Sequence, residues 1–212
     1  MHIAINPADL EPAQRHKLTI GTIVPRPIAW TTSVDGDGNV NLAPFSYFMG
    51  CHSYVPALAV SIGSRDGRAK DSRANIEASG ELVVNLVTED LAERMNITAA
   101  DFPPGVNELE VAGLTALPSA IVKPPRVAES PVNIECRVLH TLHLGEPPRE
   151  SALFVAQVVM WHIRDDLVDA DYRVDQAALH AIARMGGPAY ARTRDPFVMH
   201  IPDWREVLGR AG

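Results

Sequence analysis

Cysteine is scarce in this 212-residue chain, which contains only Cys51 and Cys136. Two thiols cannot form the framework of several disulfides that stabilises many small secreted proteins. So low a number is typical of a protein from a reducing compartment, where a free cysteine is most often a small buried apolar side chain. We therefore expect a cytoplasmic protein in which neither the Cys51–His52 neighbours nor Cys136 carries the chemistry.

Positive charge is also scarce, because 19 Lys and Arg face 26 Asp and Glu and the formal net charge is −7. An acidic chain without a long basic stripe is a poor nucleic-acid binder. The best apolar run, over residues 153–161, is interrupted by Gln157 and is far shorter than the ~18 residues of a membrane span. The first residues lack the basic start and apolar run of a signal peptide. We expect neither nucleic acid nor a membrane as a partner.

Several patterns that mark catalytic or metal sites are missing. The chain contains no Gly-x-Ser-x-Gly, no Cys-x-x-Cys and no His-Glu-x-x-His. The eight histidines are scattered at no metal-ligand spacing, and those on expected strands are interpreted as ordinary polar or core residues. The sequence therefore predicts no metal site and leaves the catalytic residues unknown.

Short apolar segments rich in β-forming residues dominate what is present. The Asp-Gly turn at residues 35–39 separates two of them and predicts a hairpin. We expect strands over residues 28–34, 40–44, 57–62, 82–87, 134–142 and 153–163. Strands joined by turns predict a mainly β fold, an antiparallel barrel or sandwich. No repeat or linker divides the chain, so we expect a single domain over residues 1–212.

Helical patterns are few and short. We expect helices over residues 72–79, 88–99 and 175–185, and loops over residues 102–110 and 123–125. Gly80 follows the first helix at the position where glycine commonly ends one. Acidic residues open the second helix, where they suit its dipole. The third presents Leu179 and Ile182 on one face and stops at Gly186.

Residues 64–73, Ser-Arg-Asp-Gly-Arg-Ala-Lys-Asp-Ser-Arg, form the one locally basic stretch, with four cations and two carboxylates. They lie between an expected buried strand and an expected helix start. Free N–H groups, the helix dipole and the cations would together favour a phosphate. Asp71 or Ser72 would cap the helix, and the Ser72 hydroxyl could donate to the phosphate. The alternative is a solvated turn with an ordinary cap.

Residues 41–48, Asn-Leu-Ala-Pro-Phe-Ser-Tyr-Phe, form a second informative segment. Pro44 cannot donate to a strand ladder, so this segment is expected at a sheet edge or a bulge. Unpaired backbone groups there could contact the edge of a heterocycle, with aromatic side chains nearby. The alternative is that these aromatics simply pack in the core.

Three of these segments together resemble a known family. Residues 23–30 (Ile-Val-Pro-Arg-Pro-Ile-Ala-Trp), 41–46 and 70–76 match, in order and spacing, the flavin reductase-like family of FMN-binding split barrels, which includes flavoredoxin. Residues 154–166 resemble a later strand of that family. The family usually has Thr where this chain has Ser72, and the hydroxyl is kept.

The resemblance implies a six-stranded split β-barrel that forms a homodimer and binds FMN in a groove near the subunit interface. It implies that Asn41, Ala43, Pro44, Phe45 and Ser46 border the isoalloxazine and the ribityl chain, largely through backbone groups. It places Ser61 beside the ribityl phosphate, and Arg68, Lys70, Asp71 and Ser72 around the phosphate itself. Asp71 is expected to orient the loop rather than to contact the anion.

The implied reaction is hydride transfer from NADH or NADPH to the flavin, whose own chemistry requires no nucleophile or triad from the protein. A monooxygenase or another acceptor would take the electrons. Two alternatives are an FMN-bound electron carrier without NAD(P)H activity and a split barrel that has lost flavin. Tyr190 or Arg192 could cover the ring or contact the nicotinamide, unless residues 184–192 are only a helix end and a loop.

Overall fold

The structure is a computed structural model and describes residues 1–103 and 105–209. Pro104, in the expected loop 102–110, and residues 210–212, at the end of the expected domain, lie outside the described residues. The strands are β1 (Ala29–Val34), β2 (Val40–Phe45), β3 (Phe48–His52), β4 (Ala57–Arg65), β5 (Arg68–Ala69), β6 (Glu81–Asn85), β7 (Ala116–Leu117), β8 (Arg126–Val127), β9 (Val132–Leu144), β10 (Ser151–Ile163), β11 (Ile182–Arg184) and β12 (Tyr190–Arg192). The helices are α1 (Pro12–Thr22), α2 (Asp71–Ser79), α3 (Ala92–Ile97), α4 (Glu108–Val111), α5 (Gln176–Leu179) and α6 (Trp204–Val207), with short 3₁₀ turns η1 (Pro7–Asp9), η2 (Glu89–Leu91) and η3 (Asp165–Leu167).

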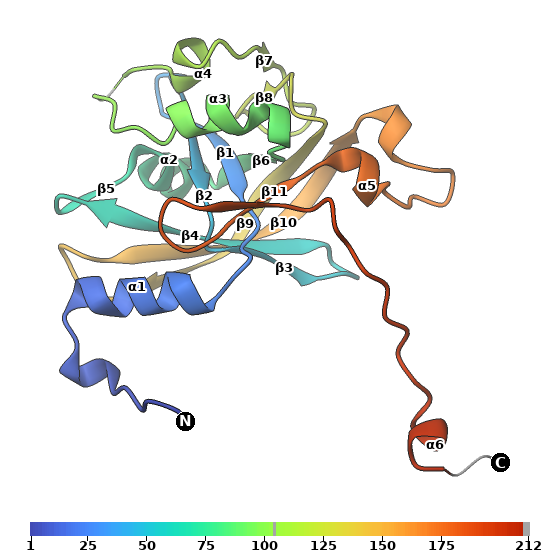
Figure 1. Cartoon of the computed structure of the whole chain (residues 1–212). Coiled ribbons are helices and arrows are strands. Elements are labelled where there is room, and N and C mark those ends of the chain that lie inside the picture. Colours follow the sequence, from blue (N-terminus) through green and yellow to red (C-terminus); the bar gives the residue numbers. More distant parts are fainter. Residues whose placement is uncertain (104, 210–212) are drawn as a thin grey trace.

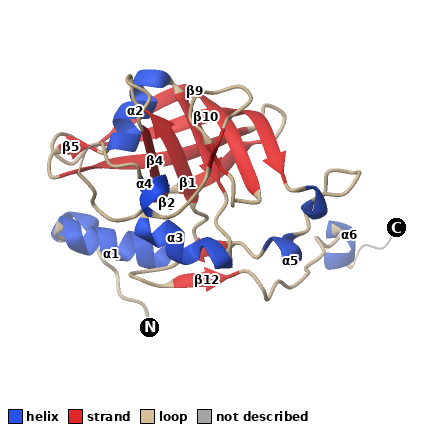
Figure 2. Cartoon of the chain, turned by 90° about the horizontal axis from the view of Figure 1, so that it is seen from above, coloured by secondary structure: helices blue, strands red, loops and turns tan. Residues whose placement is uncertain are grey.

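One antiparallel sheet organises the chain, with the strand order β2-β1-β6-β9-β10-β4-β3 and with β5 paired to β4 (Figure 1). The two strands at the ends of this order, β2 and β3, are separated in sequence only by Ser46 and Tyr47. The sheet must therefore curl until its two ends approach each other, and the Ser61 amide on β4 donates to the Tyr47 carbonyl over 2.9 Å. Figure 2 shows the curved sheet with the helices around it.

The six strands predicted from the sequence are all present in this sheet. The predicted hairpin is β1–β2, with Val34 opposite Val40, and the Asp35 carboxylate accepts the amides of Asp37 and Asn39 in its turn. Pro44 lies on β2 at the end of the strand order, so the predicted edge position is confirmed. The edge strand β3 and the short β5 were not predicted, so the sheet has eight strands rather than six.

Two apolar cores lie on opposite faces of the β1–β2 hairpin. The interior of the curled sheet is filled by buried side chains such as Phe154, Val60 and Leu82. The outer core packs Trp30 and Leu42 of the hairpin against α3, α4 and the segment around Val127. Because β1 is covered on both faces, all of its residues are buried.

The helices agree with the sequence only in part. α2 ends at Gly80 in the left-handed conformation, as predicted, with φ of 69°. The expected helix 88–99 consists of two shorter pieces, η2 and α3. The 11-residue α1 was not predicted. None of its residues is buried, so its sequence lacks the strong apolar periodicity by which a helix packed against a core is recognised.

The expected helix over residues 175–185 is wrong. Only the four-residue α5 forms, and His180 then adopts a left-handed conformation with φ of 48°. Residues 182–184 form β11 instead, where Ile182 and Ala183 are buried. The apolar residues Ile182 and Ala183 fit the pattern of a helix as well as that of a strand. In the structure these residues form a strand that pairs with β12.

The two cysteines differ. Cys136 is buried in the inner core, and burial raises the pKa of its thiol to about 12, as expected of an inert core residue. Cys51 lies exposed on the edge strand β3, so the expectation of a buried thiol is wrong there. Both are free. Among residues 1–103 and 105–209, no helix is long and apolar enough to cross a membrane.

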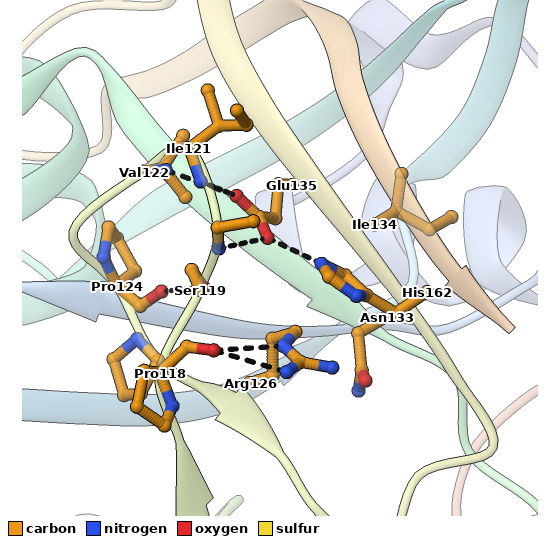
Figure 3. Close-up of polar contacts among 12 residues, drawn as sticks. Pro118, Ser119, Ile121, Val122, Pro124, Arg126, Asn133, Ile134, Glu135 and His162 are labelled. Atoms are coloured by element: carbon orange, nitrogen blue, oxygen red, sulfur yellow. Dashed lines mark hydrogen bonds and ion pairs between the residues drawn. The ribbon is translucent and has the colours of Figure 1, made fainter.

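A buried carboxylate fixes the segment that follows β7. The Glu135 side chain on β9 is fully buried and accepts hydrogen bonds from the amides of Ala120, Ile121 and Val122 (Figure 3). His162 on β10 lies 2.6 Å from the same carboxylate. Burial raises the pKa of Glu135, but the three amides and His162 more than offset this, so its pKa lies below the ordinary value.

Replacement of this carboxylate should destabilise the fold. The oxygen of Glu135→Gln cannot accept from all three amides, so we expect a loss of about 1–3 kcal/mol in the free energy of unfolding at neutral pH. Because the folded pKa is lowered, this stabilisation is present above 4.5 and is lost as the pH falls through the folded value. Urea unfolding across this pH range measures both effects.

Glu129→Gln is the matched control, since Glu129 is only half-buried and accepts a backbone amide, that of Thr115, through hydrogen bonds that are exposed to solvent. Its effect should stay within about 0.5 kcal/mol. Equal losses for the two variants would contradict the role given to Glu135.

Candidate functional site

A cleft of about 530 Å³ opens beside β2 and the beginning of α2. Its other walls are the segment after α3 and the short α4, which lie on the same side of the sheet in Figure 1. Most of the predicted site residues line it, namely Asn41, Ala43, Pro44, Phe45, Arg68, Lys70, Asp71 and Ser72. The structure therefore brings together two segments that are about 25 residues apart in sequence.

A smaller inner cavity of about 260 Å³ continues from this cleft and shares Pro44, Phe45 and Lys70 with it. The predicted residue Ser46 lines the inner cavity. Ser61 is not among the described residues that line either space. It is paired with Leu153 inside the sheet, and the predicted contact of Ser61 with a ligand finds no support in this geometry.

The basic stretch folds as a tight hairpin rather than as an open loop. β5 pairs back on β4, with Arg65 opposite Arg68, and Gly67 turns the chain with φ of 77°. A Cβ at Gly67 would also lie only 3.2 Å from the Pro148 Cβ. The turn delivers Arg68 and Lys70 to the beginning of α2.

The expected cap of α2 is wrong. The residue before the helix is Lys70, and no side chain caps the first amides; Asp71 is already helical. Ser72 is buried, and its hydroxyl lies 2.6 Å from the Asn41 amide group. This contact joins α2 to β2 beneath the cleft. The Ser72 hydroxyl is therefore bonded to the strand and does not cap the first amides of α2.

The four cations of the stretch have different partners. Arg73 is buried and bonded to Glu77 and Glu150, so it fixes α2 to the β10 end and does not line the cleft. Arg65 forms an ion pair with Asp101 on the opposite wall. Among the described residues, Arg68 and Lys70 form no ion pair.

Lys70 lies where the cleft meets the inner cavity. Its ammonium nitrogen is 5.5 Å from the centre of the Phe45 ring, within cation–π range. Burial, and then the positive charge of Arg65, lower the pKa of Lys70. A partly desolvated cation without a carboxylate partner favours a bound anion.

Glu108 is a site residue that the sequence did not reveal, because it falls in the expected loop 102–110. Asn107 caps α4 and places Glu108 against β2, where its carboxylate accepts the Leu42 amide over 3.0 Å. With its oxygen toward Ser72, the Asn41 amide donates to Glu108 over 3.3 Å. Burial and the charge of Asp71 raise the pKa of Glu108 despite the bond from Leu42.

The segment 184–192 is not a helix end, because β11 precedes it. Tyr190 lines the inner cavity, and the Arg184 guanidinium lies 4.5 Å from the centre of its ring. Arg192 is not among the described residues around that cavity and forms an ion pair with Glu89 elsewhere. Of the two predicted candidates, the structure therefore brings only Tyr190 to the site.

Comparison with known proteins now identifies the family. Residues 20–179 match the flavin reductase like domain. The chain belongs to this family. A split-barrel structure from Shewanella frigidimarina shares the fold, with a TM-score of 0.79 at 21% identity over 92% of this chain and 95% of that chain. The predicted split barrel is thereby confirmed.

Two solved structures are more similar in sequence. Nitrilotriacetate monooxygenase component B from Bacillus cereus is 33% identical, with a TM-score of 0.90 over 94% of this chain and 99% of that chain. The 2-nitrobenzoate 2-nitroreductase of Pseudomonas fluorescens is 29% identical, with a TM-score of 0.86 over 95% of this chain and 98% of that chain. The similarity thus includes the segments that form the cleft.

The raised pKa of Glu108 predicts a pH effect on stability. A raised folded pKa favours the fold below 4.5, and this contribution is lost as the pH rises through the folded value. Glu108→Gln keeps an acceptor for the Leu42 amide and removes the buried charge. Its melting temperature should exceed that of the wild type at neutral pH, with the difference shrinking in acid.

Thermal unfolding over a pH series measures this effect. Glu110→Gln, on the exposed side of the same helix, should follow the wild-type profile. A Glu108→Gln variant less stable than the wild type at neutral pH would show that the ionised carboxylate is required.

Proposed function

We propose that the cleft binds FMN and that the protein is an NAD(P)H:flavin reductase. Family membership supports flavin as the ligand. The observation that carries the proposal is the pair of cations, Arg68 and Lys70, beside the uncapped amides of α2 at one end of a cleft lined by an edge strand. Cations and free amides at a helix start favour a phosphate dianion.

The remaining predicted residues would hold the rest of the ligand. The ribityl chain would lie along Asn41, Ala43 and Ser72, and the ring would enter the inner cavity beside Pro44, Phe45 and Ser46. Asp71 would orient the turn, since a carboxylate repels the phosphate. One cluster of cations fits the single phosphate of FMN better than the diphosphate of FAD.

The protein would bind and orient FMN, and FMN, when bound, would supply the chemistry of accepting a hydride from NADH or NADPH. The inner cavity is lined by Phe45, Met95 and Tyr190, so it offers apolar and aromatic surface to a planar ring. No nucleophile or metal is required for this reaction.

A partner oxygenase would consume the reduced flavin. The similarity to component B of a nitrilotriacetate monooxygenase supports this class of acceptor. We also propose a homodimer, because Met49 on β3 and Leu139 and Leu142 on β9 expose about half of their apolar surface. The cytoplasmic location stays a prediction.

Turnover of a nicotinamide tests the reaction. We expect the purified protein to oxidise NADH or NADPH faster when FMN is added, measured as loss of the reduced-nicotinamide absorbance. Bound FMN without any turnover of either nucleotide would favour the electron carrier. A protein that stays colourless in excess FMN would favour the flavin-free barrel and overturn the proposal.

Removal of the cleft cation tests the binding mode. Lys70→Ala should weaken FMN binding by about 1–3 kcal/mol, roughly fivefold to 150-fold in Kd, because a charged hydrogen bond is lost. Fluorescence quenching of FMN measures the Kd, and far-UV circular dichroism checks the fold. Lys17→Ala, on the exposed α1, is the control with unchanged affinity. Equal affinity for the two variants would contradict the phosphate assignment.

A further inference from the structure

Arg26 is a buried cation that contacts Ser46, one of the residues that line the inner cavity. It is only 4% exposed. It does not belong to the basic stretch of residues 64–73. Its terminal nitrogens donate to the carbonyls of Ile20 and Ile23, each over 2.7 Å, and of Met185 over 3.0 Å. These bonds connect α1 to the turn after β11.

The charge of Arg26 is not matched by a carboxylate. Within residues 1–103 and 105–209, Arg26 forms no ion pair, and its acceptors are neutral. The carbonyls at the end of α1 carry only the partial negative charge of a helix dipole. A buried cation in this state retains much of its field, because little solvent screens it.

Ser46 links Arg26 to the inner cavity, because it contacts Arg26 and also lines the cavity. The Nε of Arg26 lies 3.4 Å from the Ser46 hydroxyl oxygen, and a guanidinium can only donate. The hydroxyl therefore accepts from Arg26 and must direct its own proton elsewhere. No described residue accepts that proton, and Ser46 lines the inner cavity.

The other charges around this cavity have the same sign. Lys70 and Arg184 line it, and none of its described lining residues is a carboxylate. In a chain of net charge −7, this is a local concentration of positive charge. The larger cleft has charges of both signs, because four carboxylates line it beside the cations, namely Asp66, Asp71, Asp101 and Glu108.

We propose that the Arg26–Ser46 pair is a polarised hydrogen-bond donor that makes the inner cavity bind the reduced, anionic flavin ring more tightly than the oxidised, neutral ring. The inference rests on the proposed function, since it assigns the ring to this cavity. Ser46 contacts the ring, and Arg26 is the positioning residue behind it.

The charge balance explains the preference. A hydride brings two electrons and one proton, so the neutral ring becomes an anion while NAD(P)H becomes NAD(P)⁺. A donor supported by a buried cation strengthens when its acceptor becomes charged. The protein would therefore retain reduced flavin until an acceptor docks, rather than release it at once.

The test compares the Kd of oxidised FMN with that of FMN reduced by dithionite under nitrogen, together with the midpoint potential of the bound flavin. For the wild type we expect tighter binding of the reduced form and a potential above that of free FMN. Ser46→Ala should reduce this preference about tenfold, as expected for one charge-assisted hydrogen bond. Ser46→Thr, which keeps the hydroxyl, should restore it.

Ser53→Ala, in the exposed turn after β3, is the matched control and should leave the ratio unchanged. Arg26→Lys should keep more of the preference than Arg26→Gln, provided that thermal unfolding shows both to be folded. If either Arg26 variant is unfolded, the comparison of Ser46→Ala with Ser46→Thr decides the question.

Two failures are distinguishable. Absence of binding to oxidised FMN would overturn the proposed function and this inference with it. Binding of both forms with equal affinity, or an unchanged ratio in Ser46→Ala, would overturn this inference alone.

Discussion

The site depends on an edge strand that has a partner on only one side. β2 pairs with β1, and on its other side it meets the beginning of α2 through the contact between Asn41 and Ser72. Pro44 has no amide hydrogen and so offers no donor to a further strand, although the pairing of β2 with β1 continues through Phe45. The cleft exists at this position because the curled sheet brings β2 close to β4 without backbone pairing between them.

This arrangement separates the tasks of the cations. Arg73 and Arg26 are buried and bind neighbouring segments to one another, whereas Arg68 and Lys70 remain available on the surface of the cleft. The same stretch of sequence thus contains a buried structural residue, Arg73, and two cations that face the cleft without a carboxylate partner among the described residues. Charge counts alone do not distinguish them, because burial of Arg73 depends on Glu150, which is 77 residues away.

The sequence predicted those features that depend on neighbouring residues. Alternating or continuous apolar segments identified the long strands, and the cations between a strand and a helix identified the end of the cleft. Prediction failed where distant pairing decides, as at residues 182–184, which pair with β12 on one side and bond to the backbone of Arg26 and Val87 on the other. Glu108 was missed for the same reason, since its role comes from contact with β2 and not from any local pattern.

The ion pair between Arg65 and Asp101 has a consequence for how the cleft is entered. It joins two walls of the cleft, yet both side chains are about half exposed to water. Exposed pairs of this kind contribute only about 0–1 kcal/mol. Exchange of Asp101 for the phosphate of the proposed ligand would therefore cost Arg65 little, and the entrance of the cleft could open without disturbing the fold.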